Sequence, residues 1–191
     1  SKTSIFDLLA KEKGILVFDL SGKVDSDGLR LISSSMARSI LENNASKESK
    51  DRLPCMLILE EAHRYVCRTG SDEDTIFERI AREGRKFGVF LTIISQIPSE
   101  LSKVVLSQAG LFIIHRIQNQ ADIDYLSKNV PSLTINQAQR LPTYPPGCAA
   151  VFGNSIAIPF EVKVDGKQFM DVTSTISFLN KSGRDTQSQT I

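Results

Sequence analysis

Two adjacent carboxylates that directly follow an apolar run are the side chains best suited to chemistry. The run is Met56–Leu59, and Glu60 and Glu61 come immediately after it. Such a run predicts a strand buried on both faces, and ligands of open α/β sheets bind beyond the carboxyl ends of such strands. Phosphoryl transfer uses two acids at such a place. We expect Glu60 to hold Mg²⁺, directly or through water, and Glu61 to orient the attacking water.

Basic residues recur along a second segment. Asp74–Phe87 has apolar residues at helical spacing, and Arg79, Arg82 and Lys86 fall along one face of the expected helix, with Arg85 next to Arg82. A guanidinium that reaches across a subunit boundary can stabilise charge on a transferring phosphate, a role that the compact charge of lysine fills less well. Arg82 or Arg85 is therefore a candidate arginine finger.

A third polar feature follows the next apolar segment. Val89–Ser95 is predicted as a strand, Gln96 comes directly after it, and Ser99 is a possible N-cap of a short helix. In a parallel sheet Gln96 would lie beside the acid pair, where its amide could donate to a γ-phosphate or to water and accept from it. Arg116 follows a fourth predicted strand and is expected at the same edge, as a weaker candidate for contact with phosphate or a neighbouring subunit.

Each of these features also has a purely structural interpretation. Apolar strands often end in solvated acids, charge runs commonly form solvated helix faces, and Gln96 could belong to a turn that enters a helix. His63 lies close to the acids, but the sequence lacks HxxxH or HxxE spacing around it. It is therefore more typical of a packing or supporting residue than of a metal ligand.

Several familiar motifs are missing from the 191 residues. The sequence contains no GxGxxG, HExxH or GxSxG, which counts against dinucleotide binding, zinc-protease and α/β-hydrolase chemistry. It also contains no G-x-x-x-x-G-K-[ST], the loop that cradles phosphates in P-loop proteins. The acid pair therefore stands in this sequence without a phosphate-binding loop.

The elements that must position these residues alternate between strand and helix. Strands are predicted at 14–20, 55–59, 89–95 and 111–115, and helices at 28–41, 74–87, from 98, at 121–128 and at 134–140. Apolar segments at 149–152 and 156–164 predict a hairpin, joined at 153–155. The alternation predicts an α/β fold, with a mostly parallel sheet covered by helices on both faces and a C-terminal β-hairpin.

Length and composition fit one soluble domain. The chain has 191 residues, with 41% hydrophobic and 24% charged, and we expect residues 1–164 to form the domain and 165–191 a polar tail. No run approaches 18 apolar residues and the start lacks signal-peptide features, so a cytoplasmic location without membrane contact is expected. Three cysteines without CxxC spacing predict neither a zinc site nor a disulfide framework.

The formal net charge of +1 gives no strongly basic footprint. Any contact with DNA would therefore come from a local patch, or from a pore in which several subunits add their charges.

Taken in order, the motifs resemble those of the HerA-like ATPases of the HerA/FtsK superfamily. Leu57–Arg64 is similar to the Walker B segment of that family, Arg82–Val89 to its finger helix, and Ser95–Pro98 to its sensor strand. Gly14–Gly22 resembles the strand that precedes Walker B. The similarity spans residues 14–164 in matching order.

The resemblance implies the C-terminal part of a RecA-like P-loop NTPase domain, in a homo-hexameric ring that hydrolyses ATP with Mg²⁺ and moves duplex DNA through its pore. It assigns Glu60 to the metal, Glu61 to catalysis, Gln96 to the sensor and Arg82 or Arg85 to the finger. It further implies a NurA-like nuclease or a defence effector as partner, in DNA end processing or phage defence. Because Walker A is missing, we expect these residues to be an inactive fragment of a longer polypeptide.

Two alternative functions remain open at this point. A conjugative or type IV secretion ATPase shares the Glu-Glu and Gly-Arg-Lys features. A non-hydrolysing ring scaffold that recruits an effector belongs to a different class. The intact acid pair argues against the scaffold, because a protein that only assembles has no need of paired acids at the edge of a sheet.

Overall fold

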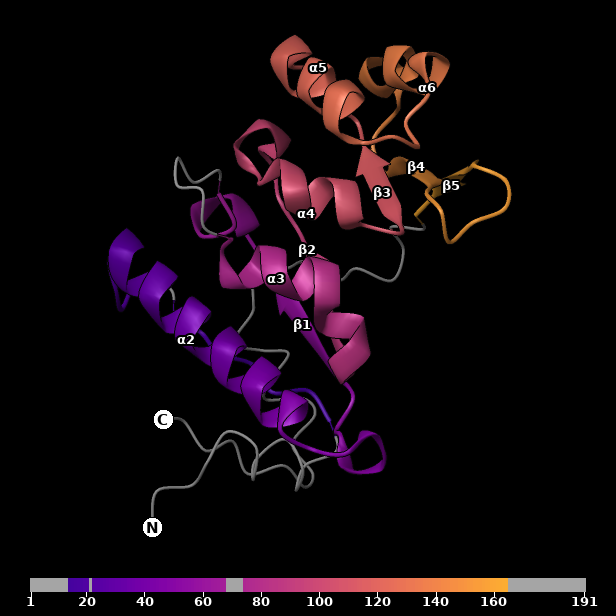
Figure 1. Cartoon of the computed structure of the whole chain (residues 1–191). Helices are drawn as coiled ribbons and strands as arrows, with labels where there is room; N and C mark the ends of the chain where they lie inside the picture. The colour runs from indigo at the N-terminus through magenta and orange to yellow at the C-terminus, as the bar shows by residue number, and fades with distance from the viewer. Residues whose placement is uncertain (1–13, 21, 68–73, 165–191) are drawn as a thin grey trace, which may run out of the picture.

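The structure is a computed structural model that describes residues 14–20, 22–67 and 74–164 (Figure 1). The predicted tail at 165–191 lies outside the described residues. The helices are α2 (Ser26–Ala45), α3 (Ile76–Glu83), α4 (Lys103–Gln108), α5 (Gln120–Asn129) and α6 (Ile135–Arg140). The strands are β1 (Cys55–Leu59), β2 (Val89–Ile93), β3 (Phe112–His115), β4 (Cys148–Phe152) and β5 (Phe160–Lys163). The 3₁₀ turns are η1 (Ser49–Asp51), η2 (Ala62–Arg64), η3 (Gly84–Phe87), η4 (Pro98–Glu100) and η5 (Leu141–Thr143).

The strands of the described residues form two separate sheets. β1 and β2 pair in parallel, with Cys55 opposite Val89 and Leu59 opposite Ile93. The second sheet has the order β3-β4-β5 and is antiparallel throughout. Parallel strands, flanking helices and C-terminal antiparallel strands confirm the predicted α/β class. The fourth predicted strand, however, is not part of the parallel sheet, because β3 pairs with β4, which comes more than thirty residues later.

Helices cover the parallel pair on one face. The β1 side chains Cys55, Leu57 and Leu59 pack against the core, which includes Phe77 and Ile80 of α3. The alternate β1 side chains, Met56 and Ile58, are 58% and 59% exposed. Phe90 of β2 and Ile94, which directly follows β2, are exposed as well. The prediction that helices cover both faces is therefore wrong for the described residues, in which this apolar face has no helix packed on it.

Several helices begin directly after residues whose side chains cap the helix N-terminus. Asp25 caps α2 and accepts a hydrogen bond from the Gly28 amide, and Thr75 forms a capping box with Glu78 at the start of α3. Thr134 caps α6, as predicted. Ser99, in contrast, is not an N-cap: η4 begins at Pro98, and the serine that caps α4 is Ser102.

One predicted strand is absent, and another is much shorter than expected. Residues 14–20 are not a strand, and Ile15 is 91% exposed, since no described strand lies beside them to complete the backbone hydrogen bonds. The second arm of the predicted hairpin is a strand only at β5, because residues 156–159 leave the pairing and Ile158 is 76% exposed.

Gly84 allows α3 to approach β2 closely. A Cβ atom at this position would lie 2.4 Å from the backbone oxygen of Val89 and 3.0 Å from Cγ2 of Ile80. Any other residue would therefore push the end of α3 away from the strand. This close approach fixes the basic segment that includes Arg85 at the amino end of β2.

A buried asparagine joins α2 to the segments that precede β1 and β2. Asn44 is 2% exposed, and its Nδ2 donates to the backbone oxygens of Leu53 (2.8 Å) and Phe87 (2.9 Å). One side chain thus connects α2 to the residues that precede β1 and to the end of η3.

Replacement of Asn44 by alanine is expected to lower the free energy of unfolding by about 2 kcal/mol, because two inward-facing carbonyl groups lose their donor. Urea unfolding of the chain measures this change. The matched control is Asn43→Ala, since no side-chain hydrogen bond of Asn43 is present among the described residues. Equal destabilisation by the two variants would contradict the assigned role of Asn44.

Candidate functional site

The turn after β1 has an uncommon backbone conformation at the second acid. Glu61 has φ 48° and ψ 44°, in the left-handed region, and it is the one non-glycine residue with positive φ in the described ranges. For an L-residue with a Cβ this conformation costs on the order of 1 kcal/mol, so the surroundings must hold it. Ala62 N donates to Ile94 O at 2.9 Å, and Ile94 N donates to Leu59 O at 2.9 Å. These bonds on both sides of Glu61 fix the turn against the end of β2.

The same turn is anchored in the core. Ala62 is fully buried, and the Tyr65 ring packs on Phe77 with its centroid 6.1 Å away. The Tyr65 hydroxyl donates to the backbone oxygen of Glu60. Burial raises the pKa of this hydroxyl; the charge of Glu60 raises it further, Arg64 opposes the rise, and Glu61 adds a smaller increase. Tyr65 therefore stays a neutral hydrogen-bond donor near neutral pH.

The Glu61 carboxylate has a polar neighbour at each oxygen. Gln96 Nε2 donates to Oε1 at 2.9 Å, and His63 Nδ1 lies 3.5 Å from Oε2. His63 Nδ1 also lies 3.2 Å from the Ser95 hydroxyl oxygen. The structure therefore brings Gln96 and Glu61 together, as the parallel-sheet prediction requires. The Glu61 side chain is still 46% exposed, so it can meet a ligand or water that approaches from solvent.

Glu60 lies on the uncovered face of the sheet, in the same alternation as Met56 and Ile58. It is exposed, and its carboxylate makes no hydrogen bond or ion pair with another described residue. The described ranges hold no cluster of three side chains of the kinds that bind metals. Mg²⁺ does not need such a cluster, because proteins bind it with one or two carboxylates together with water and substrate phosphates. The free carboxylate of Glu60 beside Glu61 fits this requirement.

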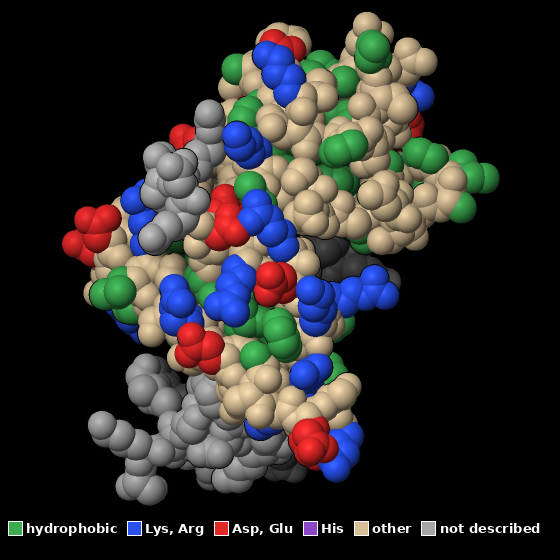
Figure 2. Space-filling view, in the orientation of Figure 1, with side chains coloured by type: hydrophobic (Ala, Val, Ile, Leu, Met, Phe, Trp, Pro, Cys, Tyr) green, Lys and Arg blue, Asp and Glu red, His purple; other side chains and the backbone are tan. Residues whose placement is uncertain are grey.

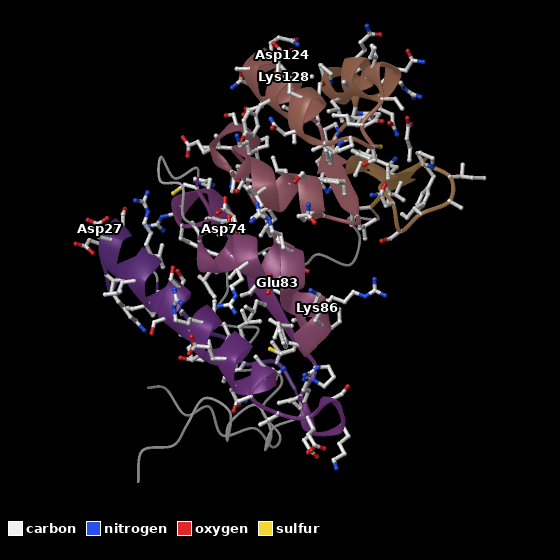
Figure 3. The ribbon with its side chains drawn as sticks, in the orientation of Figure 1. Asp27, Asp74, Glu83, Lys86, Asp124 and Lys128 are labelled. Carbon is white, nitrogen blue, oxygen red and sulfur yellow. The ribbon has the colours of Figure 1, made fainter. Side chains whose placement is uncertain are left out.

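The predicted basic face is balanced by acids. Arg82 pairs with Asp74, and Arg79 lies 3.9 Å from Glu83. Figure 2 accordingly shows blue and red side chains interspersed over this side of the molecule, with no continuous basic patch. Asp74, Glu83 and Lys86 lie along the same segment in Figure 3.

Arg85 differs from Arg82 in its surroundings. It is exposed in η3 and makes no ion pair with any other described residue. It lies just before β2, whereas Gln96 lies just after it, so the five residues of the strand separate them by about 16 Å. Since an arginine side chain reaches less than half of that distance, Arg85 does not contact the acid pair of its own chain.

Arg116 does not lie where the sequence predicts it. It follows β3, and β3 belongs to the antiparallel sheet instead of the parallel pair. The expected position at the same edge as the acids is therefore wrong for the described residues. A short apolar segment predicts a strand well, but the partner of that strand is decided by the rest of the chain.

Sequence reasoning missed a buried carboxylate that holds the neighbouring elements together. Glu78 is 7% exposed and accepts from Ser102 Oγ and from Thr75 N, while Ser102 N donates to Val66 O at 3.0 Å. Burial by itself raises the pKa of Glu78. The hydrogen bonds from Ser102 and Thr75, with the charge of Arg82, outweigh burial and lower this pKa below its ordinary value. The Thr75-x-x-Glu78 spacing of a capping box was the available signal.

His63 and Ser95 also form a contact that spacing alone does not show. They lie 32 residues apart and meet because β1 and β2 pair in register. The available signal was a serine at the predicted end of the strand that neighbours the acid pair.

Comparison with known proteins finds relatives that match most of this chain. The chain matches no family profile. It is 34% identical over 151 residues to the DNA double-strand break repair helicase HerA of Saccharolobus solfataricus, which covers 75% of this chain and 30% of that protein. The HerA helicase of Pyrococcus furiosus is 35% identical over 147 residues, covering 68% of this chain and 26% of that protein. The chain thus spans less than a third of the length of these curated relatives.

Solved structures show the same fold. The genome packaging NTPase of Sulfolobus turreted icosahedral virus 2 in complex with ATP-gammaS has a TM-score of 0.61 at 19% identity, covering 85% of this chain and 72% of that chain. Its complex with AMPPCP has a TM-score of 0.52 at 20% identity, covering 61% of this chain and 58% of that chain. These likenesses establish the fold of a P-loop ATPase domain.

No helix in the described ranges combines the length and the apolar character that crossing a bilayer requires. The order of the motifs, the parallel pair with its two terminal acids, and the similarity to HerA helicases lead to one assignment. The chain belongs to the HerA-like family of ATPases.

Proposed function

We propose that this chain supplies the hydrolytic part of an ATP-driven motor that moves double-stranded DNA. The observation that supports this most is the contact between Gln96 and Glu61 across the carboxyl ends of two parallel strands. An acid held by an amide at this edge has the geometry needed to orient an attacking water. The free carboxylate of Glu60 beside it has the chemistry to hold Mg²⁺.

Each residue of the site takes one role in this proposal. When Mg²⁺ is bound it neutralises charge on the phosphates of ATP, and Glu60 would hold it, directly or through water. Glu61 positions the attacking water and polarises it. Gln96 reports the state of the γ-phosphate to Glu61, because its amide has a donor and an acceptor that can be shared between them.

The phosphates themselves would be held by a loop outside these 191 residues. The sequence has no Walker A motif, and the chain spans less than a third of its curated relatives. We call the protein that contains this chain together with that loop the complete enzyme. By the same reasoning, the 191 residues alone would not hydrolyse ATP.

The arginine finger would act on a neighbouring subunit. Arg85 lies at the end of β2 that is remote from the acids of its own chain, and it is exposed there without an acidic partner among the described residues. Such an arginine suits a phosphate that belongs to another copy. This supports a closed ring, and we propose a homo-hexamer with DNA in its pore.

The substrate and partner are proposed from the relatives. The curated relatives are named as helicases of DNA double-strand break repair. We therefore propose DNA end processing in the cytoplasm, together with a NurA-like nuclease, or phage defence with an effector in its place.

The test is steady-state ATP hydrolysis by the complete enzyme, with and without linear duplex DNA. We expect duplex DNA to raise the turnover number several-fold, because a translocase couples its cycle to DNA. Absence of turnover under both conditions would contradict the motor and support the ring scaffold. Turnover that DNA leaves unchanged would instead favour a secretion-type ATPase.

A further inference from the structure

We infer that His63 is a positioning residue, which fixes the orientation of the Glu61 carboxylate for water activation. The inference rests on the proposed function, since it assigns His63 a task only if Glu61 orients water. It goes beyond that function because it gives His63 a specific task, whereas the sequence indicated only a packing or supporting residue.

The first argument is that the two oxygens of Glu61 are held by different groups. Gln96 lies 2.9 Å from Oε1, and His63 lies 3.5 Å from Oε2. A carboxylate held at one oxygen can still pivot about that contact, whereas a second polar contact at the other oxygen restricts this rotation. His63 supplies the second contact through Nδ1, at the longer distance of 3.5 Å.

The second argument is that His63 is itself held in place. Nδ1 lies 3.2 Å from Ser95 Oγ, and that oxygen accepts from the backbone nitrogen of Ile97 at 3.1 Å. The Ser95 hydroxyl is therefore fixed by the backbone just after β2. As Gln96 follows Ser95 directly, the two groups that contact the Glu61 carboxylate are both positioned by the same short segment.

The third argument is the difference in burial. The His63 side chain is 15% exposed and that of Glu61 is 46% exposed. The residue before His63, Ala62, is completely buried and is bonded to Ile94. The histidine is thus placed by the core, while the carboxylate that it contacts faces solvent. This is the arrangement expected of a group that supports a reactive side chain from the side of the protein core.

A role as a metal ligand explains the position of His63 less well than a positioning role does. Only one histidine and the two acids gather at this turn, and the described residues contain no set of three side chains able to bind a metal. The His63 ring nitrogen that lies near Glu61 is also hydrogen-bonded to the Ser95 hydroxyl.

The test compares two variants of the complete enzyme with a matched control. His63→Leu keeps the bulk but removes the ring nitrogen that contacts Glu61, and we expect kcat for ATP hydrolysis to fall about tenfold while KM for ATP stays unchanged. His63→Asn places an amide nitrogen close to the position of Nδ1 and should recover most of the loss. His115→Ala is the control, since His115 is the other histidine of the chain and bonds to the backbone oxygen of Cys148. It should retain the wild-type kcat.

Equal loss in the leucine and asparagine variants would indicate a role in packing and would overturn the inference. Wild-type kcat in His63→Leu would overturn it too. The double variant His63→Leu with Glu61→Gln gives the decisive comparison, because a residue that acts through Glu61 adds no further loss once Glu61 is changed. Additive losses would reject the inference and leave the proposed function standing. Wild-type turnover in Glu61→Gln alone would reject both.

Discussion

Replacement of Glu61 by glutamine is expected to leave nucleotide binding intact and to slow ATP hydrolysis by the complete enzyme about a hundredfold or more. Glutamine keeps the size of the side chain but loses the negative charge that polarises the attacking water. Binding of a fluorescent ATP analogue and the rate of phosphate release measure the two effects separately.

The matched control for this change is Glu83→Gln. Glu83 is an acid on α3 that lies near Arg79, and it makes no contact with Glu60 or Glu61. It should keep the wild-type rate. Near-normal turnover in Glu61→Gln would remove Glu61 from the catalytic role, and loss of nucleotide binding would show that the acid holds the ligand instead of activating water.

Replacement of Arg85 by alanine is expected to reduce turnover by about three orders of magnitude or more without unfolding the subunit. The guanidinium is exposed and has no acidic partner among the described residues, so its removal breaks no contact that maintains the fold. Steady-state ATPase and thermal unfolding measure the two properties. Lys86→Ala is the control, because Lys86 is the adjacent exposed cation.

Arg82→Ala decides between the two arginines. Its exposed pair with Asp74 contributes little to stability, so the variant should fold. If Arg82 variants lose turnover and Arg85 variants do not, the finger is Arg82.

Mixed assemblies test whether the finger acts on a neighbour. A ring that contains both Arg85→Ala and Glu61→Gln subunits has some interfaces with an intact acid and an intact arginine. These interfaces should restore part of the activity that each variant lacks alone. Failure to restore activity at any ratio would mean that the arginine serves its own subunit or has no part in hydrolysis.

The elements that local pattern controls were predicted well from the sequence. β1 has the predicted bounds, α5 and α6 begin and end within a residue or two of theirs, and Thr134 caps α6 as expected. These features depend on residues within one or two turns of each other. The pairing of β3 with β4 and the absence of a strand at 14–20 depend on partners elsewhere in the chain, which a local apolar pattern does not identify.

The contact between Gln96 and Glu61 was predicted from the sequence, whereas the backbone geometry of Glu61 was not. Acids after one strand and an amide after its parallel neighbour were enough to place Gln96 beside Glu61. The left-handed backbone of Glu61 has no sequence signal, because glutamate is not a residue that favours this conformation. The position expected for Arg116 failed because it assumed that all four strands share one sheet.

β2 extends from the end of the basic segment to the residues that contact Glu61. Its five residues pair with β1 along their whole length, so a displacement at one end of the strand would be carried to the other end. In a ring where Arg85 contacts the phosphate of one neighbour, the other end of β2 would adjust Gln96 and Glu61 in the next nucleotide site. Release of phosphate at one site would then change the catalytic geometry of the following site, and the subunits would hydrolyse ATP in sequence around the ring.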